Sequence, residues 1–254
     1  MNAPFSTVDF TGVVRQLRTC RTDAPFRYVV TPNVDHLVRL SREPRLLPLY
    51  ERSWLSLCDG RIAQRLARIL GHHLGLVSGS DLVAAMFAHI IEAGDRICVV
   101  GGSAGMVEAL GLMRPDIAID HVSPPMGLAH DEDARNCVVM RVAGERYRYI
   151  FLAVGSPQQE MIAAEMMDAE TVTGTALCVG GGLDYVTGHK RRAPLIVQRV
   201  GLEFVWRIAE DPRRLWRRYL QDGPAILIIA FKWALAGKSD GHQSRARSNH
   251  RTRD

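Results

Sequence analysis

Short apolar runs alternate with longer segments of helical periodicity along most of the chain. Apolar runs of this length, bounded by Gly, Asn or Asp, are typical of strands buried in a sheet. They predict strands at Arg27–Thr31, Trp54–Cys58, Arg96–Val100, Ile117–Val122, Tyr149–Val154 and Ala176–Val179. The intervening segments predict helices at Asp35–Leu40, Arg61–Leu70, Asp81–Ala93, Ala104–Met113, Glu132–Val142 and Gln159–Met167. This alternation predicts an α/β fold, with a mainly parallel, Rossmann-like sheet and helices on both faces.

The pattern changes after Gly188. Two segments rich in Arg and Trp predict helices at Pro194–Arg207 and Pro212–Leu220. The apolar stretch Gly223–Gly237 is shorter than the roughly 20 residues of a membrane-spanning helix. It fits a helix lying in a membrane interface or a buried core helix, and both alternatives stay open. We therefore predict a catalytic domain over 1–193, a C-terminal helical membrane-associating appendage over 194–237, and a disordered basic tail over 238–254.

Composition places the chain among ordinary globular proteins, with 47% hydrophobic residues in 254. The net charge is +5, and the basic residues concentrate between Lys190 and Arg218, which favours a phosphate-bearing or anionic partner. A solvated basic face is the alternative, and we expect no nucleic-acid partner. Five cysteines without CxxC spacing indicate reduced thiols. The N-terminus shows no basic segment followed by an apolar one, so we expect no signal peptide and a cytoplasmic protein.

Four clusters of polar residues or glycines follow predicted strands. They are Thr31–His36, Cys58–Gly60, Val154–Glu160 and Val179–Asp184. Each has an ordinary structural interpretation. Asn33 or Asp59 could cap a helix, His36 could be structural, and Ser156 and Pro157 read as N-cap and first residue of a helix. The consecutive glycines around Gly181 would instead allow a ligand to approach the backbone closely.

Together the clusters resemble the WecG/TagA/CpsF glycosyltransferases, glycosyltransferase family 26. The matching segments are TPNVDHL at 31–37, CDGRIAQRLARILG at 58–71, SGSDLV at 78–83, VVGGSAGMVEAL at 99–110, VGSPQQE at 154–160, VGGGLDYVTGHKRRAP at 179–194 and GLEFVWRIAEDPRRLWRRYL at 201–220. The resemblance implies inverting transfer of a sugar from a UDP-sugar to a sugar on a polyprenyl diphosphate. It also implies a peripheral location on the inner face of the cell membrane and a role in cell-surface or exopolysaccharide biosynthesis.

The resemblance also assigns roles to residues. It makes Asp59 the base that takes the acceptor proton, and it places Thr31 near the reacting sugar. Residues expected to hold donor substrate are Asn33, Gln159, Gly181 and Asp184, with Arg207, Arg214 and Arg217 closing over the diphosphate. No cofactor or metal is expected, and the appendage could complete its own or a neighbour's site in a homo-oligomer. Where the family often has a basic residue, this chain has Gln158, so donor preference among N-acetylmannosamine, its uronic acid and glucose stays open.

Three competing interpretations stay open. Asp131-Glu132-Asp133 spells a metal-binding Asp-x-Asp, although it also opens a predicted helix, where acids suit the helix dipole. The glycines at 101, 102 and 105 suggest a nicotinamide-dependent oxidoreductase, with Asp120 as the only acid at a suitable distance. The third interpretation is a non-catalytic, membrane-recruited scaffold of a polysaccharide assembly complex, against which the presence of Thr31 and Asp59 argues.

Overall fold

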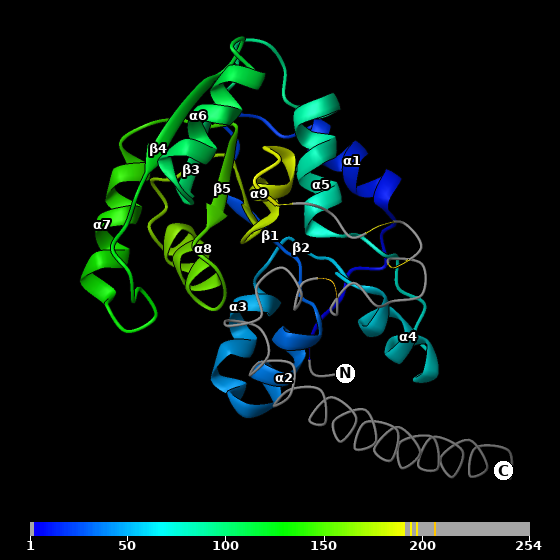
Figure 1. The fold of residues 1–254 in the computed structure, drawn as a ribbon. Coiled ribbons are helices and arrows are strands. Elements are labelled where there is room, and N and C mark those ends of the chain that lie inside the picture. The colour runs from blue at the N-terminus through cyan, green and yellow to red at the C-terminus, as the bar shows by residue number, and fades with distance from the viewer. Residues whose placement is uncertain (1–2, 191–193, 195–196, 198–205, 207–254) are drawn as a thin grey trace, which may run out of the picture.

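One parallel sheet of six strands forms the centre of the protein (Figure 1). This computed structural model describes residues 3–190 together with Pro194, Val197 and Trp206. The strands are β1 (Arg27–Val30), β2 (Leu55–Ser56), β3 (Arg96–Gly101), β4 (Ala118–Val122), β5 (Tyr149–Ala153) and β6 (Thr175–Cys178). They lie in the order β2-β1-β6-β5-β3-β4, and every neighbouring pair is parallel. The predicted α/β class and the six predicted strands are confirmed.

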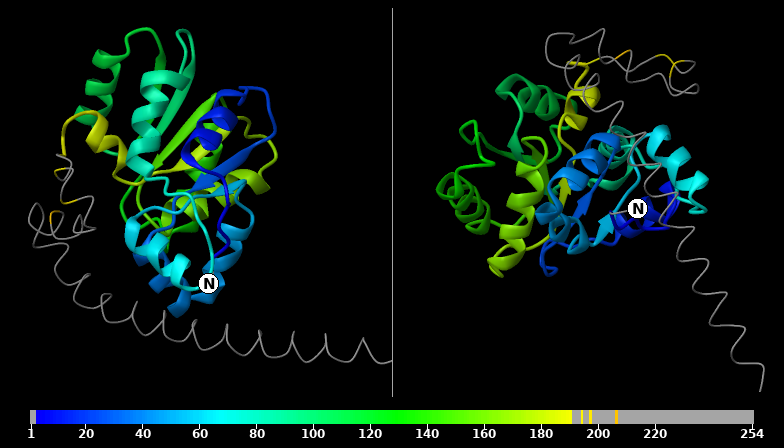
Figure 2. Two further views of the ribbon diagram at one scale, coloured as in Figure 1. Left: turned by 90° about the vertical axis from the view of Figure 1, so that its right-hand side faces the viewer. Right: turned by 90° about the horizontal axis from the view of Figure 1, so that it is seen from below.

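Helices cover both faces of the sheet, as Figure 2 shows from two further directions. One face packs against α2 (Val34–Arg42), α3 (Leu47–Glu51), α7 (Glu132–Ala143) and α8 (Gln158–Asp168). The other packs against α1 (Phe10–Arg18), α5 (Gly79–Ala85), η2 (Met86–Ile90), α6 (Ala104–Met113) and α9 (Gly182–Val186). Alternate strand residues point to opposite faces, so Tyr28 and Val30 join the first core and Val29 the second. Burial on both faces explains why the strands read as continuous apolar runs.

Several short elements were not predicted: α1, η1 (Pro44–Leu46), α3 and α9. The predicted helix Asp81–Ala93 is also wrong at its C-terminal end, because α5 passes into the π-helical turn η2 and helix ends at Ile90. Arg114 explains this end. Its guanidinium donates to the carbonyl oxygens of Phe87 at 2.6 Å and Ile91 at 3.1 Å, satisfying acceptors that a longer helix would use.

The predicted appendage, the basic tail and the boundary between 193 and 194 lie outside the described residues. Within the described part of the chain, no helix is long and apolar enough to cross a membrane.

Candidate active site

The carboxyl ends of parallel strands meet at one edge of a sheet, where α/β proteins bind their ligands. Here the neighbouring strands β2, β1, β6 and β5 bring the predicted clusters to that edge. Asp59 follows β2, Thr31 and Asn33 follow β1, Gly181 and Asp184 follow β6, and Gln159 lies in the first turn of α8 after β5. We call these six residues the carboxyl-edge site. Clusters separated by more than a hundred residues in sequence are thus adjacent in space.

Asp59 is not the N-cap of the helix that follows it. The N-cap of α4 (Arg61–Ile69) is Gly60, with φ of 101° and no side-chain capping hydrogen bond, so the capping interpretation of Asp59 is wrong. The Asp59 backbone N–H donates to the Pro32 carbonyl oxygen at 3.1 Å, which ties it to the segment between Thr31 and Asn33. Burial, reinforced by the Asp59 charge, raises the pKa of the neighbouring Cys58 thiol to about 12. Cys58 is therefore an inert thiol, and the carboxylate at this strand end is that of Asp59.

Thr31 links the ends of two strands beneath a helix. Its side chain is buried, and its hydroxyl donates to the Cys178 carbonyl oxygen at 3.2 Å, joining β1 to β6. A Cβ atom on Gly79 would lie 3.2 Å from the Thr31 hydroxyl oxygen, so α5 approaches this residue closely because it begins with glycine. Gly182 packs against Gly79 in the same way, with its own Cβ position 3.7 Å from the Gly79 carbonyl carbon. The two glycines let α5 and α9 converge over the end of β1.

A chain of buried polar groups joins Asn33 to the glycine-rich loop. Asn33 caps α2: its side-chain oxygen accepts from the Asp35 backbone N–H at 3.0 Å and lies 2.8 Å from His36 Nδ1, in a capping box. On its other side, His36 Nε2 lies 3.7 Å from Glu160 Oε1. The capping interpretation of Asn33 and the structural interpretation of His36 are confirmed.

Gln159 continues this chain to the loop. Its Nε2 donates to Glu160 Oε1 at 2.9 Å, and its Oε1 accepts from the Gly180 backbone N–H at 3.0 Å. Only 4% of Gln159 is exposed, so its amide holds the loop from beneath. Complete burial raises the pKa of Glu160, and the hydrogen bond from Gln159 acts in the opposite direction. Sequence reasoning did not assign a role to Glu160, although its place beside Gln159 in the shared motif was a signal.

The Gly-Ser-Pro turn differs from its predicted capping. The N-cap of α8 is Pro157 and the helix begins at Gln158, so the assignment of Ser156 as N-cap is wrong. Ser156 instead accepts a hydrogen bond from Arg39, whose Nη1 lies 2.7 Å from the Ser156 hydroxyl oxygen. Arg39 was missed because it lies on α2, more than a hundred residues away in sequence. It brings a positive charge next to a strand end where Gln158 brings none.

Asp184 forms an ion pair with Lys190, which sequence reasoning also missed. The Lys190 backbone N–H donates to the Asp184 carbonyl oxygen at 3.0 Å, so the chain folds back over α9. A Cβ on Gly181 would lie 3.4 Å from both the Asp184 carboxylate and the Lys190 amine. A Cβ at 181 would therefore make ordinary van der Waals contact with the pair. The predicted diphosphate-binding residues Arg207, Arg214 and Arg217 lie outside the described residues.

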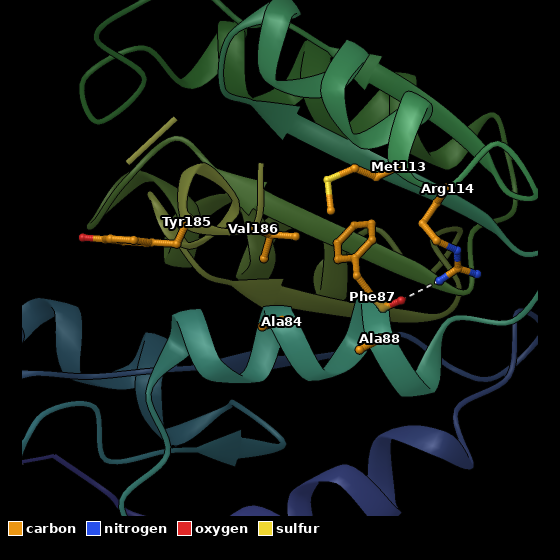
Figure 3. Close-up of a pocket in the computed structure, with 7 residues that line it drawn as sticks. All are labelled: Ala84, Phe87, Ala88, Met113, Arg114, Tyr185 and Val186. Atoms are coloured by element: carbon orange, nitrogen blue, oxygen red, sulfur yellow. Dashed lines mark hydrogen bonds between the residues drawn. The ribbon is translucent and has the colours of Figure 1, made fainter. Parts of the chain in front are cut away.

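A separate apolar pocket of about 350 Å³ lies between α5, η2, α6 and α9 (Figure 3). Its lining residues are Ala84, Phe87, Ala88, Met113, Arg114, Tyr185 and Val186. The Arg114 guanidinium is bound to backbone carbonyl oxygens and to Asp116, and none of the predicted site residues lines the pocket. The pocket therefore offers apolar volume, whereas the groups suited to acid–base chemistry lie at the carboxyl edge.

The residues behind two competing interpretations have structural roles. Asp131 caps α7, with its carboxylate accepting from the Ala134 backbone N–H at 2.9 Å, as its position in the sequence suggested. Asp120 lies within β4, where it accepts from Tyr147 at 2.8 Å and pairs with Arg96 at 2.7 Å. It is therefore not the free strand-end acid that a dinucleotide site requires. No group of three or more His, Cys, Asp or Glu with metal-binding geometry occurs in the described part of the chain.

The family model described as "Glycosyl transferase WecG/TagA/CpsF family" matches residues 1–240. The chain belongs to this family. The match spans most of the chain, including every residue of the carboxyl-edge site. Membership makes the protein a glycosyltransferase of cell-wall polysaccharide biosynthesis, acting on a sugar donor and an acceptor. In this family glycosyltransferase, the six residues of the carboxyl-edge site lie at the sheet edge where α/β folds bind substrates.

Proposed function

We propose that this glycosyltransferase moves a hexose derivative from a UDP-sugar to a sugar carried on a polyprenyl diphosphate, with inversion at the anomeric carbon. The observation that carries the proposal is the position of Asp59. It follows β2 at the carboxyl edge, stands outside the cap of α4, and is tied by its backbone to the Thr31–Asn33 segment. A carboxylate so placed is suited to remove a proton from an attacking hydroxyl.

In the proposed reaction, Asp59 accepts the proton of the acceptor hydroxyl as that oxygen bonds to the anomeric carbon. The bond between this carbon and the diphosphate breaks on the opposite side, and UDP leaves with the electron pair. Thr31 lies beside the reacting sugar, and the backbone of the loop around Gly181 approaches the donor. Gln159 acts by holding this loop through Gly180, at 3.0 Å. Asn33 lines the same edge next to Thr31.

Negative charge on the departing UDP requires cations or N–H donors, and we propose that no metal is used. Among described residues, Lys190 beside Asp184 and Arg39 beside Ser156 place positive charge near the strand ends. Arg207, Arg214 and Arg217 are the further proposed contributors. The donor sugar is proposed to be N-acetylmannosamine, its uronic acid or glucose, and the enzyme to act at the inner face of the cell membrane through its C-terminal appendage.

The first test is ligand-dependent thermal unfolding with UDP, several UDP-sugars and, as controls, NAD and NADP. A ligand at about a hundred times its dissociation constant stabilises the native state by roughly 2.7 kcal/mol, which shifts the melting temperature measurably. We expect a shift with UDP and one UDP-sugar and none with NAD. The absence of a shift with any uridine nucleotide would contradict the proposed donor class.

The second test distinguishes a mechanism with Asp59 as the base from one with a metal ion bound by the Asp-x-Asp sequence. Asp59→Asn should keep the UDP-induced shift and lose transfer by about 10²–10⁴-fold, the range of a missing general base. Asp133→Asn is the matched control, since it makes the same change at an exposed position of the Asp-x-Asp sequence. It should leave transfer unchanged. Full activity of Asp59→Asn would remove Asp59 from the mechanism, and lost activity of Asp133→Asn would restore the metal interpretation.

A further inference from the structure

Helix α4, which follows the candidate base, carries an unusual exposed face. Arg61, Arg65 and Arg68 are all exposed and recur at positions i, i+4 and i+7, so they lie along one side of the helix. The buried residues Ala63 and Ala67 lie on the other side and pack towards the core. The arginines are therefore held outward by the packing of the helix. We call Arg61, Arg65, Arg68 and the adjacent Ile69 the α4 face.

The charge of the α4 face is not neutralised within the described part of the chain. The segment Arg61–Ile69 contains no Asp or Glu, and no ion pair or hydrogen bond involves these three guanidinium groups among described residues. Elsewhere, Arg52, Arg96 and Arg114 each pair with a carboxylate. The α4 face is thus a local cluster of uncompensated positive charge, which fits a polyanionic partner.

An exposed aliphatic side chain also lies on this face, beside the arginines. Ile69 is 78% exposed next to Arg65 and Arg68. On an anionic bilayer, the three guanidinium groups would contact the headgroups and the Ile69 side chain would lie below them. Arg61 and Arg68 are about 10 Å apart along the axis, a span that several anionic headgroups can meet at once.

The position of α4 relates such a membrane contact to the candidate active site. The helix begins two residues after Asp59, and Figure 1 shows it at the outer end of the molecule on the β2 side of the sheet. A bilayer against this face would lie close to the carboxyl edge, where a lipid-linked acceptor must present its hydroxyl. We propose that the α4 face docks on an anionic lipid bilayer and orients the carboxyl-edge site towards it. This inference rests on the proposed lipid-linked acceptor for its role in catalysis.

The test uses the full chain and sedimentation with vesicles of phosphatidylcholine containing about one third phosphatidylglycerol, a strongly anionic surface. The variant is Arg61→Gln, Arg65→Gln, Arg68→Gln. The matched control is Arg18→Gln, Arg141→Gln, Arg146→Gln, which removes the same charge from exposed positions. Arg18 and Arg146 lie near Arg148, which precedes β5 and marks the opposite edge of the sheet.

Each basic residue near an anionic surface contributes roughly fivefold to partitioning, so the α4 variant should bind at least about tenfold more weakly. The control should stay within about twofold of the unaltered protein. Both should melt as the unaltered protein does, since exposed surface substitutions rarely change stability. Unchanged vesicle binding of the α4 variant would overturn the proposal and leave residues 194–237 as the membrane-binding part. If the control variant lost vesicle binding to the same extent, the effect would be due to net charge alone, and the proposal would also be overturned.

A separate readout keeps this inference distinct from the proposed function. The UDP-induced melting shift, measured without vesicles, should be the same in the α4 variant and the unaltered protein. If UDP gives no shift in either protein, the proposed donor fails while the vesicle result still decides the docking face. If UDP gives a shift and the α4 variant keeps its vesicle binding, the docking face fails and the proposed donor stands.

Discussion

Gln159 offers the sharpest test of how the site is built. Its amide makes two buried contacts, accepting from the Gly180 N–H at 3.0 Å and donating to Glu160 at 2.9 Å. Gln159→Ala removes both. Gln158→Ala is the matched control, because Gln158 is the preceding residue of α8 and is only partly buried. The two variants compare the same Gln→Ala change at a residue that bonds to Gly180 and Glu160 and at a neighbour that does not.

The two contacts differ in what their loss costs. The Gly180 N–H keeps an alternative acceptor in the Leu152 carbonyl oxygen at 3.2 Å, so little is lost there. The Glu160 carboxylate loses its hydrogen bond from the Gln159 amide, and a hydrogen bond to a charged group contributes about 1.5–3 kcal/mol. We expect Gln159→Ala to destabilise the fold by about 2–3 kcal/mol. At about 2–4 °C per kcal/mol, the melting temperature should fall by roughly 4–12 °C.

The loss should depend on pH with a definite sign. Burial raises the pKa of Glu160, and the Gln159 hydrogen bond lowers it, so removing Gln159 raises the folded-state pKa further. The variant's deficit should therefore be smallest where Glu160 is protonated and should grow over the pH range in which Glu160 ionises in the folded protein. Thermal unfolding of both variants across this range measures the effect. Equal melting temperatures for the two variants, or a deficit that grows towards low pH, would refute the reasoning.

Two further predictions concern Glu160 itself and Gly174. Because the folded-state pKa of Glu160 is raised, its contribution to stability is present below about pH 4.5 and is lost as pH rises through the folded-state value. Glu160→Gln should therefore gain stability relative to the unaltered protein towards neutral pH. Urea unfolding that shows the opposite trend would contradict this prediction. Gly174→Ala should destabilise the fold by several kcal/mol more than Gly94→Ala, whose cost is roughly 1–2 kcal/mol. Both glycines have positive φ, but only the Cβ at 174 would meet the Tyr147 carbonyl oxygen, at 2.1 Å, and similar denaturation midpoints would contradict the steric explanation.

The six strands and most of the longer helices could be predicted from the sequence, as could the residue types that follow the strands. Central parallel strands are buried on both faces, so each must be an apolar run, and their positions could be read directly. Asp59, Thr31 and the glycines around Gly181 could be picked out as candidate site residues because they follow these runs, and strand ends are where a ligand reaches the backbone. Short elements such as α3 and α9 escaped prediction, since five residues are too few to show a helical period.

The strand order and the contacts made by each site residue could be known only from the tertiary structure. The order puts β6 between β1 and β5, which brings Gly180 within reach of Gln159, and no local pattern encodes this pairing. The structure also showed that the N-cap of α4 is Gly60 and not Asp59, and that the Arg39 side chain donates to Ser156. Hydrogen bonds between residues far apart in sequence depend on how the helices pack on the sheet. Their partners become identifiable only when the sheet is assembled.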